Sequence, residues 1–109
     1  MKKGEICLVD VDFIDSSESK VRPALIISNN SYNKTHPDLI ICSVTTNSSH
    51  DCFLEIGRAD LAAGQLYPGS GVRYDSVTRM DKARVGKKIG KVNAEFHLAL
   101  VEKITSLLS

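Results

Sequence analysis

The sequence contains no tryptophan, and aromatic residues make up only 6% of its 109 residues. No apolar run approaches the ~20 residues that a membrane-spanning helix needs. Glu5, Asp10 and Asp12 interrupt the apolar residues near the amino-terminus, so the apolar core of a signal peptide is missing. We therefore expect a cytoplasmic protein with a single domain over residues 1–109.

The three cysteines, Cys7, Cys42 and Cys52, form no Cys-x-x-Cys pair. This pattern favours reduced thiols in the core over a disulfide framework. A zinc site built from these thiols and His50 is an alternative, but the spacing matches no zinc-ligand pattern. We therefore predict no metal site and no cofactor. The three histidines, His36, His50 and His97, are expected to be bystanders.

The formal net charge is only +1, but the charges are unevenly distributed. Residues 73–91 carry seven basic side chains against Asp75 and Asp81. Such a basic cluster is typical of a surface that contacts phosphate. The alternative is a solvated edge strand whose lysines discourage aggregation.

One stretch, Lys20–Asn29, organises the rest of the chain. Pro23 favours extended backbone at Arg22, which we place at the entrance of a strand. The apolar run Ala24–Ile27 ends at turn-forming residues, as in a strand buried on both faces. A stiffly held arginine at that point can bind an anion, although it can also mark the end of a surface strand.

The remaining pattern is mainly β. A first strand is predicted over Gly4–Val11, with Glu5 on the same face as Cys7 and Val9. A carboxylate on that face requires a partner or an open cleft. Asn29–Pro37 is typical of an irregular turn or one helical turn, and Arg58–Gly64 of a brief helical turn ended by glycine. Further strands are predicted over Asp38–Thr46, Cys52–Ile56, Ser70–Arg79 and Gly86–Val92, the last of which is alternatively a basic loop.

The sequence predicts a helix from Asn93 to Leu108, capped by Asn93. Its apolar stripe consists of Leu100, Val101, Ile104, Leu107 and Leu108, and this stripe must pack on a sheet or on a partner chain. Short strands followed by one terminal helix favour a small antiparallel barrel with the helix packed against it.

The chemistry concentrates in Ser70–Asp75. Arg73 and Asp75 are two residues apart on a strand, so they face the same way, roughly 6–7 Å apart at Cα. Such a pair can flank a phosphodiester: the carboxylate accepts the proton of a ribose 2′-hydroxyl, and arginine stabilises charge at phosphorus. The alternative is an ordinary ion pair on an exposed strand.

Four segments follow one another in the order seen in the PemK/MazF growth-inhibitor toxins, which this sequence resembles over almost its whole length. They are Lys3–Asp10, Val21–Asn29, Ser43–Thr46 and Ser70–Asp75. The PemK (Kid) branch is the most similar. The resemblance implies a Src-homology-3-like barrel, mainly β with a C-terminal α-helix, that acts as a homodimer.

The same resemblance implies a sequence-specific, metal-independent ribonuclease. Such enzymes cut single-stranded RNA to leave a 2′,3′-cyclic phosphate and a 5′-hydroxyl. A cognate antitoxin is implied as a partner, in a complex that binds its own operator DNA.

Individual site residues follow from the resemblance. Asp75 matches the family's general base, Arg73 the arginine proposed as its acid, and Arg22 the arginine at the scissile phosphate. We assign Arg73 to charge stabilisation, because arginine scarcely gives up a proton at neutral pH. The predicted RNA-contacting residues are Glu5, Ser17, Thr45, Thr46, Ser70 and Arg79.

Two departures from the family pattern matter. The first loop offers Ser16, Ser17 and Glu18 where the PemK branch has a histidine, and residues 76–79 replace the family's Gln-Ile-Arg-Thr. Two alternatives therefore stay open. One is a catalytically weakened RNA-binding relative. The other is a DNA gyrase inhibitor like CcdB, although CcdB proteins carry a functional C-terminal tryptophan that this chain lacks.

Overall fold

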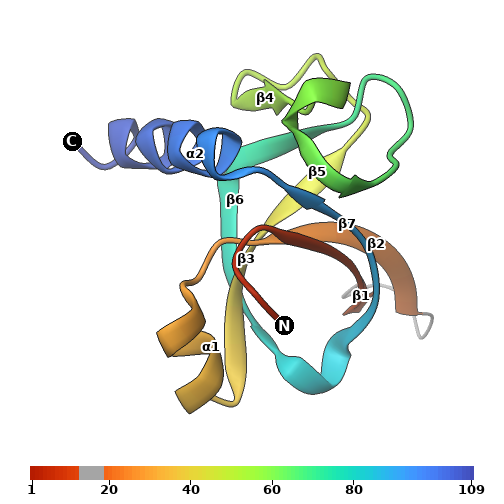
Figure 1. The fold of residues 1–109 in the computed structure, drawn as a ribbon, viewed down its shortest axis with the longest axis vertical. Coiled ribbons are helices and arrows are strands. Elements are labelled where there is room, and N and C mark those ends of the chain that lie inside the picture. The colour runs from red at the N-terminus through yellow and green to blue at the C-terminus, as the bar shows by residue number, and fades with distance from the viewer. Residues whose placement is uncertain (13–18) are drawn as a thin grey trace.

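In a computed structural model that describes residues 1–12 and 19–109, the chain forms a curled antiparallel sheet with a helix at its C-terminal end (Figure 1). The helices are α1 (Asn30–Thr35) and α2 (Ala94–Ser106), with 3-10 turns at Arg58–Asp60 and Lys82–Arg84. The strands are β1 (Glu5–Asp12), β2 (Ser19–Ile26), β3 (Asp38–Thr45), β4 (Phe53–Glu55), β5 (Leu61–Gly64), β6 (Gly71–Asp81) and β7 (Val85–Val92).

All the strand pairs are antiparallel, in the order β4-β6-β3-β2-β1-β7-β5. The sheet curls so that α1 lies at one end and α2, β4 and β5 lie at the other (Figure 1). This arrangement confirms the predicted mainly-β fold with a C-terminal helix. None of the helices within the described ranges is long and apolar enough to cross a membrane.

Alternating side chains of the central strands fill two apolar clusters. Ile6 and Leu25 belong to one cluster, into which α2 inserts Phe96 and Leu100. Their neighbours on the opposite face, among them Cys7, enter the second cluster. Burial on both faces explains why β1 and β2 are almost continuously apolar rather than alternating. Because both faces pack, the register of β2 and β3 is strongly specified, and functional residues at the strand ends are held on a rigid base.

The second strand begins earlier than predicted. It starts at Ser19, so Arg22 lies inside β2 rather than at its entrance. Pro23 pairs with Leu8 of β1, while pairing of β2 with β3 begins only at Ala24. A residue without an N–H is tolerated where a strand has a neighbour on one side only.

The prediction for Arg58–Gly64 is half wrong. Only Arg58–Asp60 forms a helical turn, and Leu61–Gly64 is the strand β5. Residues 61–64 form a strand because they pair with the edge of β7: Leu61 pairs with Val92, and Gly64 pairs with Gly90. The same pairing resolves Gly86–Val92 as a strand, part of β7. Asn29–Pro37 contains the short helix α1, capped by the Asn29 side chain, which accepts from the Tyr32 N–H at 2.8 Å.

The terminal helix is capped as predicted, because the Asn93 side chain accepts a hydrogen bond from the Phe96 N–H at 2.8 Å. Its packed face differs from the predicted stripe. Phe96, His97 and Leu100 are buried, whereas Val101, Leu107 and Leu108 are exposed. Three of the five residues of the predicted stripe are therefore available for a partner chain.

Candidate functional site

Arg73 and Asp75 contact each other on β6. The Arg73 Nε donates to one Asp75 carboxylate oxygen at 3.2 Å and its Nη2 donates to the other at 3.1 Å. Their side chains are 36% and 39% exposed, so a ligand can reach both. The predicted juxtaposition of these two residues is therefore present, in the bidentate geometry that arginine also offers to phosphate.

A large bulge in β6 presents this pair. Cys42 pairs with Val77 and Val44 pairs with Val72, so residues 73–76 of β6 face Ser43 alone. Hydrogen bonds hold the bulge on both sides. The Ser76 and Ser43 hydroxyls lie 2.8 Å apart, and the Tyr74 N–H donates to the Cys52 carbonyl at 3.1 Å. Bulges re-aim side chains in this way beside active sites.

The ion pair sets the protonation states of its two members. The Arg73 guanidinium lowers the pKa of Asp75 below its ordinary value, and His50 adds a smaller effect in the same direction. The hydrogen bonds to Asp75 in turn raise the pKa of Arg73. Asp75 is thus ionised at neutral pH, but as a weak base for as long as Arg73 is bound to it. His50, expected from the sequence to be a bystander, is close enough to matter electrostatically.

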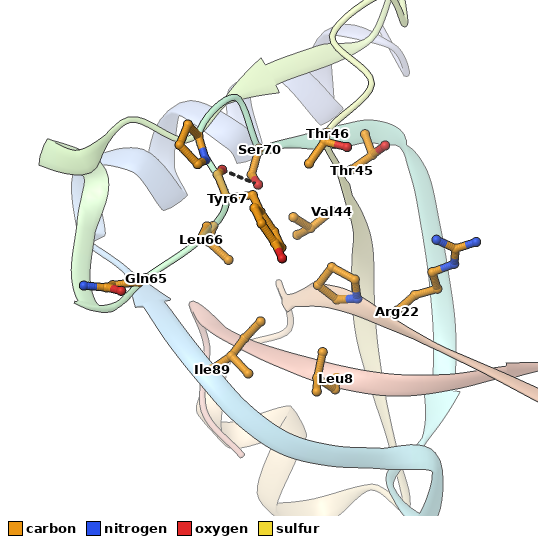
Figure 2. Close-up of a pocket in the computed structure, with 12 residues that line it drawn as sticks. Leu8, Arg22, Val44, Thr45, Thr46, Gln65, Leu66, Tyr67, Ser70 and Ile89 are labelled. Carbon is orange, nitrogen blue, oxygen red and sulfur yellow. Dashed lines mark hydrogen bonds between the residues drawn. The ribbon is translucent and has the colours of Figure 1, made fainter.

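A pocket of about 630 Å³ opens beside the start of β6 (Figure 2). It brings together four of the residues predicted from the sequence: Arg22, Thr45, Thr46 and Ser70. Its floor and walls are mainly apolar and include Leu8, Pro23, Val44, Leu66, Tyr67 and Ile89. A mostly apolar pocket with a few convergent polar groups is typical of a ligand site.

Three neighbouring strands, β2, β3 and β6, carry Arg22, Thr45 and the ion pair. Arg22 lies on β2, Thr45 on β3, and Thr45 pairs with Gly71, two residues before Arg73 on β6. In Figure 2 the Arg22 guanidinium lies at the rim and points away from Leu66 and Ile89. The Thr45–Gly71 pairing therefore puts the β3 side of the pocket two residues along β6 from Arg73.

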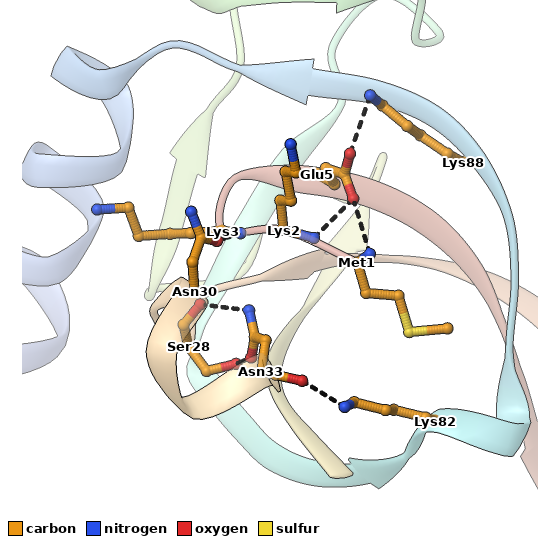
Figure 3. Close-up of polar contacts among 9 residues, drawn as sticks. All are labelled: Met1, Lys2, Lys3, Glu5, Ser28, Asn30, Asn33, Lys82 and Lys88. Atoms are coloured by element: carbon orange, nitrogen blue, oxygen red, sulfur yellow. Dashed lines mark hydrogen bonds and ion pairs between the residues drawn. The ribbon is translucent and has the colours of Figure 1, made fainter. Parts of the chain in front are cut away.

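Glu5 lies apart from this pocket. It shares a face of β1 with Cys7 and Val9, while the pocket residue Leu8 faces the other way. Its carboxylate is 2.9 Å from the Lys88 Nζ and accepts from the Lys2 N–H at 2.7 Å (Figure 3). Burial would raise the pKa of Glu5, but Lys88, the Lys2 N–H and the amino-terminus together lower it. These contacts supply the partner that a carboxylate on this face requires.

Arg79 also lies outside the pocket, toward the far end of β6. Its Nε is 2.7 Å from the Asp38 carboxylate. Lys82 donates to the Asn33 carbonyl, so several members of the basic cluster already have protein partners (Figure 3). The charges of Arg73, Arg79 and Lys88 are each paired with a carboxylate. Ser17, a predicted RNA contact, falls outside the described residues.

The three cysteine thiols form no disulfide, and two of them are buried. Cys7, Cys42 and Cys52 are free, and burial raises the pKa of Cys42 to about 12. Across residues 1–12 and 19–109, no group of three or more His, Cys, Asp or Glu side chains is arranged to hold a metal ion.

Sequence reasoning missed Tyr67, an exposed residue that lines the pocket. The available signal was its position just before Pro68-Gly69, a pair that is typical of a tight turn.

Comparison with known proteins places this geometry in context. The chain matches the family described as "PemK-like, MazF-like toxin of type II toxin-antitoxin system" over residues 2–108. A search of curated protein sequences finds no match.

Solved structures with the same fold are available. One is a MazE–MazF complex from Deinococcus radiodurans, 20% identical, with a TM-score of 0.80 over 99% of this chain and 95% of that one. Another is an endoribonuclease in complex with its cognate antitoxin from a mycobacterial species, 18% identical, with a TM-score of 0.70 over 99% and 94%. The Mycobacterium tuberculosis toxin MazF-mt6 is 22% identical, with a TM-score of 0.69 over 95% of each chain. At these identities the likeness establishes the fold.

Proposed function

Because the chain belongs to the PemK-like, MazF-like family of toxins of type II toxin-antitoxin systems, we propose that it is a sequence-specific endoribonuclease. It cuts single-stranded RNA by internal attack of a ribose 2′-hydroxyl and needs no metal ion. The observation that carries this proposal is the bidentate Arg73–Asp75 pair, presented on a bulge beside a pocket that contains Arg22.

Asp75 acts as the general base. Its carboxylate takes the proton of the 2′-hydroxyl, and the 2′-oxygen attacks the adjacent phosphorus. The bond from phosphorus to the 5′-oxygen breaks, and that oxygen takes a proton from water. The products are a 2′,3′-cyclic phosphate and a 5′-hydroxyl.

Arg73 changes partner during this reaction. In the free protein its guanidinium is bound to Asp75 and weakens it as a base. A phosphate oxygen of the RNA offers the same bidentate acceptor geometry. As Arg73 moves onto the phosphate, the pKa of Asp75 rises toward its ordinary value and the carboxylate becomes a better base at the moment it is needed. Arg73 then stabilises the charge that develops on phosphorus.

Arg22 supplies a second cation, at the pocket rim. It holds the scissile phosphate from the β2 side while Arg73 approaches from β6. The hydroxyl groups of Thr45, Thr46 and Ser70 lie in the same pocket and offer hydrogen bonds to unpaired bases or phosphates. Unpaired bases expose edges that such groups can read, which is the basis of the proposed sequence specificity.

The proposed partners of this chain are those expected for its toxin family. We propose a homodimer whose activity is neutralised by a cognate antitoxin, with the complex binding its own operator DNA. Exposed apolar side chains on α2, Leu98 and Val101 among them, support an interface with a second copy.

The test is cleavage of a long single-stranded RNA in EDTA. The wild-type protein cuts it, and Asp75→Asn lowers the rate at least ~100-fold, as expected for loss of a general base. Arg73→Ala and Arg22→Ala lower it by about 100-fold or more, because each removes charge stabilisation at the phosphate. Asp10→Asn, which alters an exposed carboxylate elsewhere on the sheet, leaves the rate unchanged.

The same assay separates the alternatives. RNA that is bound but never cut contradicts the proposal in favour of an RNA-binding relative. Inertness toward RNA together with inhibition of DNA gyrase contradicts it in favour of a CcdB-like protein. An unchanged cleavage rate in Arg22→Ala shows that this residue is only structural.

A further inference from the structure

Tyr67 is an exposed aromatic residue at the edge of the pocket. Its side chain is 82% exposed, although tyrosine carries a large apolar ring. In Figure 2 the ring lies between Leu66 and Val44. It belongs to the segment between β5 and β6 and comes just before the bulge that carries Arg73 and Asp75.

The backbone under this ring is rigid. The Ser70 N–H donates to the Tyr67 carbonyl at 3.1 Å, and the Ser70 hydroxyl donates to the same oxygen at 2.7 Å. Between them lie Pro68, whose ring restricts φ, and Gly69, whose φ is +84°. Proline followed by a glycine with positive φ is the pattern of a type II β-turn.

The anchor of this turn is buried. Ser70 is only 4% exposed and leads directly into β6. The turn therefore fixes the Tyr67 backbone beside the pocket, so little backbone entropy is lost when a flat ligand lies against the ring.

We propose that Tyr67 is the platform on which one unpaired nucleobase of the RNA stacks, next to the scissile phosphate. The inference rests on the proposed function and deepens it. Bases stack on aromatic side chains in proteins that bind single-stranded nucleic acid, because every base has a π-face. The pocket volume, the adjacent Arg22 cation and the Thr45 and Ser70 hydroxyls fit a nucleotide better than they fit an apolar side chain of a protein.

Binding is measured with an RNA oligonucleotide that contains the cleavage site and carries a 2′-deoxy nucleotide there, which prevents cutting. Tyr67→Leu, which keeps an apolar side chain but removes the aromatic face, weakens binding about tenfold. Tyr67→Phe keeps the ring and binds as tightly as wild type. Val21→Ala, a matched change of an exposed apolar residue on β2, has no effect.

A scan with abasic nucleotides tests stacking itself. In the wild type, removing the base at one position next to the cut weakens binding about tenfold. In Tyr67→Leu, removing the same base weakens binding no further, because the stacking of that base on the ring has already been lost. If Tyr67→Leu binds normally, or if the base and ring losses add at every position, the inference is overturned.

Failure of this inference differs from failure of the proposed function. If the wild-type protein cuts RNA and Tyr67→Leu binds and cuts it equally well, only the proposed stacking on Tyr67 is overturned. A wild-type protein that leaves RNA uncut overturns both. If Tyr67→Leu weakens binding of a protein partner but not of RNA, the ring contacts that partner, and the inference is contradicted.

Discussion

In the free protein, contact with Arg73 keeps Asp75 ionised but also makes it a weaker base. It must be ionised to accept a proton, and the Arg73 guanidinium ensures this by lowering its pKa. The same contact makes the carboxylate a weaker base. In the mechanism that we propose, Arg73 moves from Asp75 to the RNA phosphate and removes this conflict, because the carboxylate becomes a stronger proton acceptor only when substrate is present.

Removing the guanidinium tests this coupling. In Arg73→Gln the pKa of Asp75 rises toward the ordinary aspartate value of about 3.9. The measurement is an NMR titration of the Asp75 side-chain carboxyl carbon in both proteins, with Asp10 as an internal control. Because the wild-type pKa is lowered, its carboxylate stays ionised to more acidic pH and protonates only as pH falls through that lower value. Equal titration of Asp75 in the two proteins contradicts the coupling.

Single residues were predicted from the sequence with uneven success. Alternation along a strand correctly placed Arg73 beside Asp75, and Arg22, Thr45, Thr46 and Ser70 share one pocket. For Glu5, the sequence left open whether the carboxylate meets a protein partner or an open cleft. Its burial against Lys88 depends on how β1 lies beside β7, a pairing that no local pattern reveals.

The strand β6 and the helix α2 are the elements on which the site and the proposed dimer depend. The sequence predicted a strand over Ser70–Arg79, but the bulge over residues 73–76 arises from the register of β6 with β3, which the sequence of β6 alone does not encode. Edge pairing with β7 likewise turns Leu61–Gly64 into a strand where glycine suggested the end of a helical turn.

The two apolar faces of α2 predict different mutational effects. Leu100 is fully buried, so Leu100→Ala leaves a cavity and lowers the free energy of unfolding by about 3 kcal/mol. Leu98 is 61% exposed on the outer face, so Leu98→Glu leaves the monomer folded but introduces charge into the proposed dimer interface. Urea denaturation measures the first effect and sedimentation velocity the second. A Leu98→Glu protein that still sediments as a dimer contradicts this assignment of the interface.

At the scale of the whole molecule, the curled sheet brings distant segments to one place. Residues from β1, β2, β3 and β7 line one pocket beside the turn that presents Tyr67. Composition and strand pattern were sufficient to predict a small antiparallel barrel with a terminal helix. They could not predict the pocket, because its shape depends on how the β5–β6 segment folds over the strand ends, and Tyr67 went unnoticed for that reason.

The central claim is that the ribose of the RNA cuts its own phosphodiester, with Asp75 and Arg73 assisting. The chemical ends of the fragments test it most directly, by mass spectrometry of a short RNA cut by the purified protein. We predict a 2′,3′-cyclic phosphate on the upstream fragment and a 5′-hydroxyl on the downstream one. A 3′-hydroxyl with a 5′-phosphate would contradict the account, because those ends require attack by water rather than by the 2′-hydroxyl.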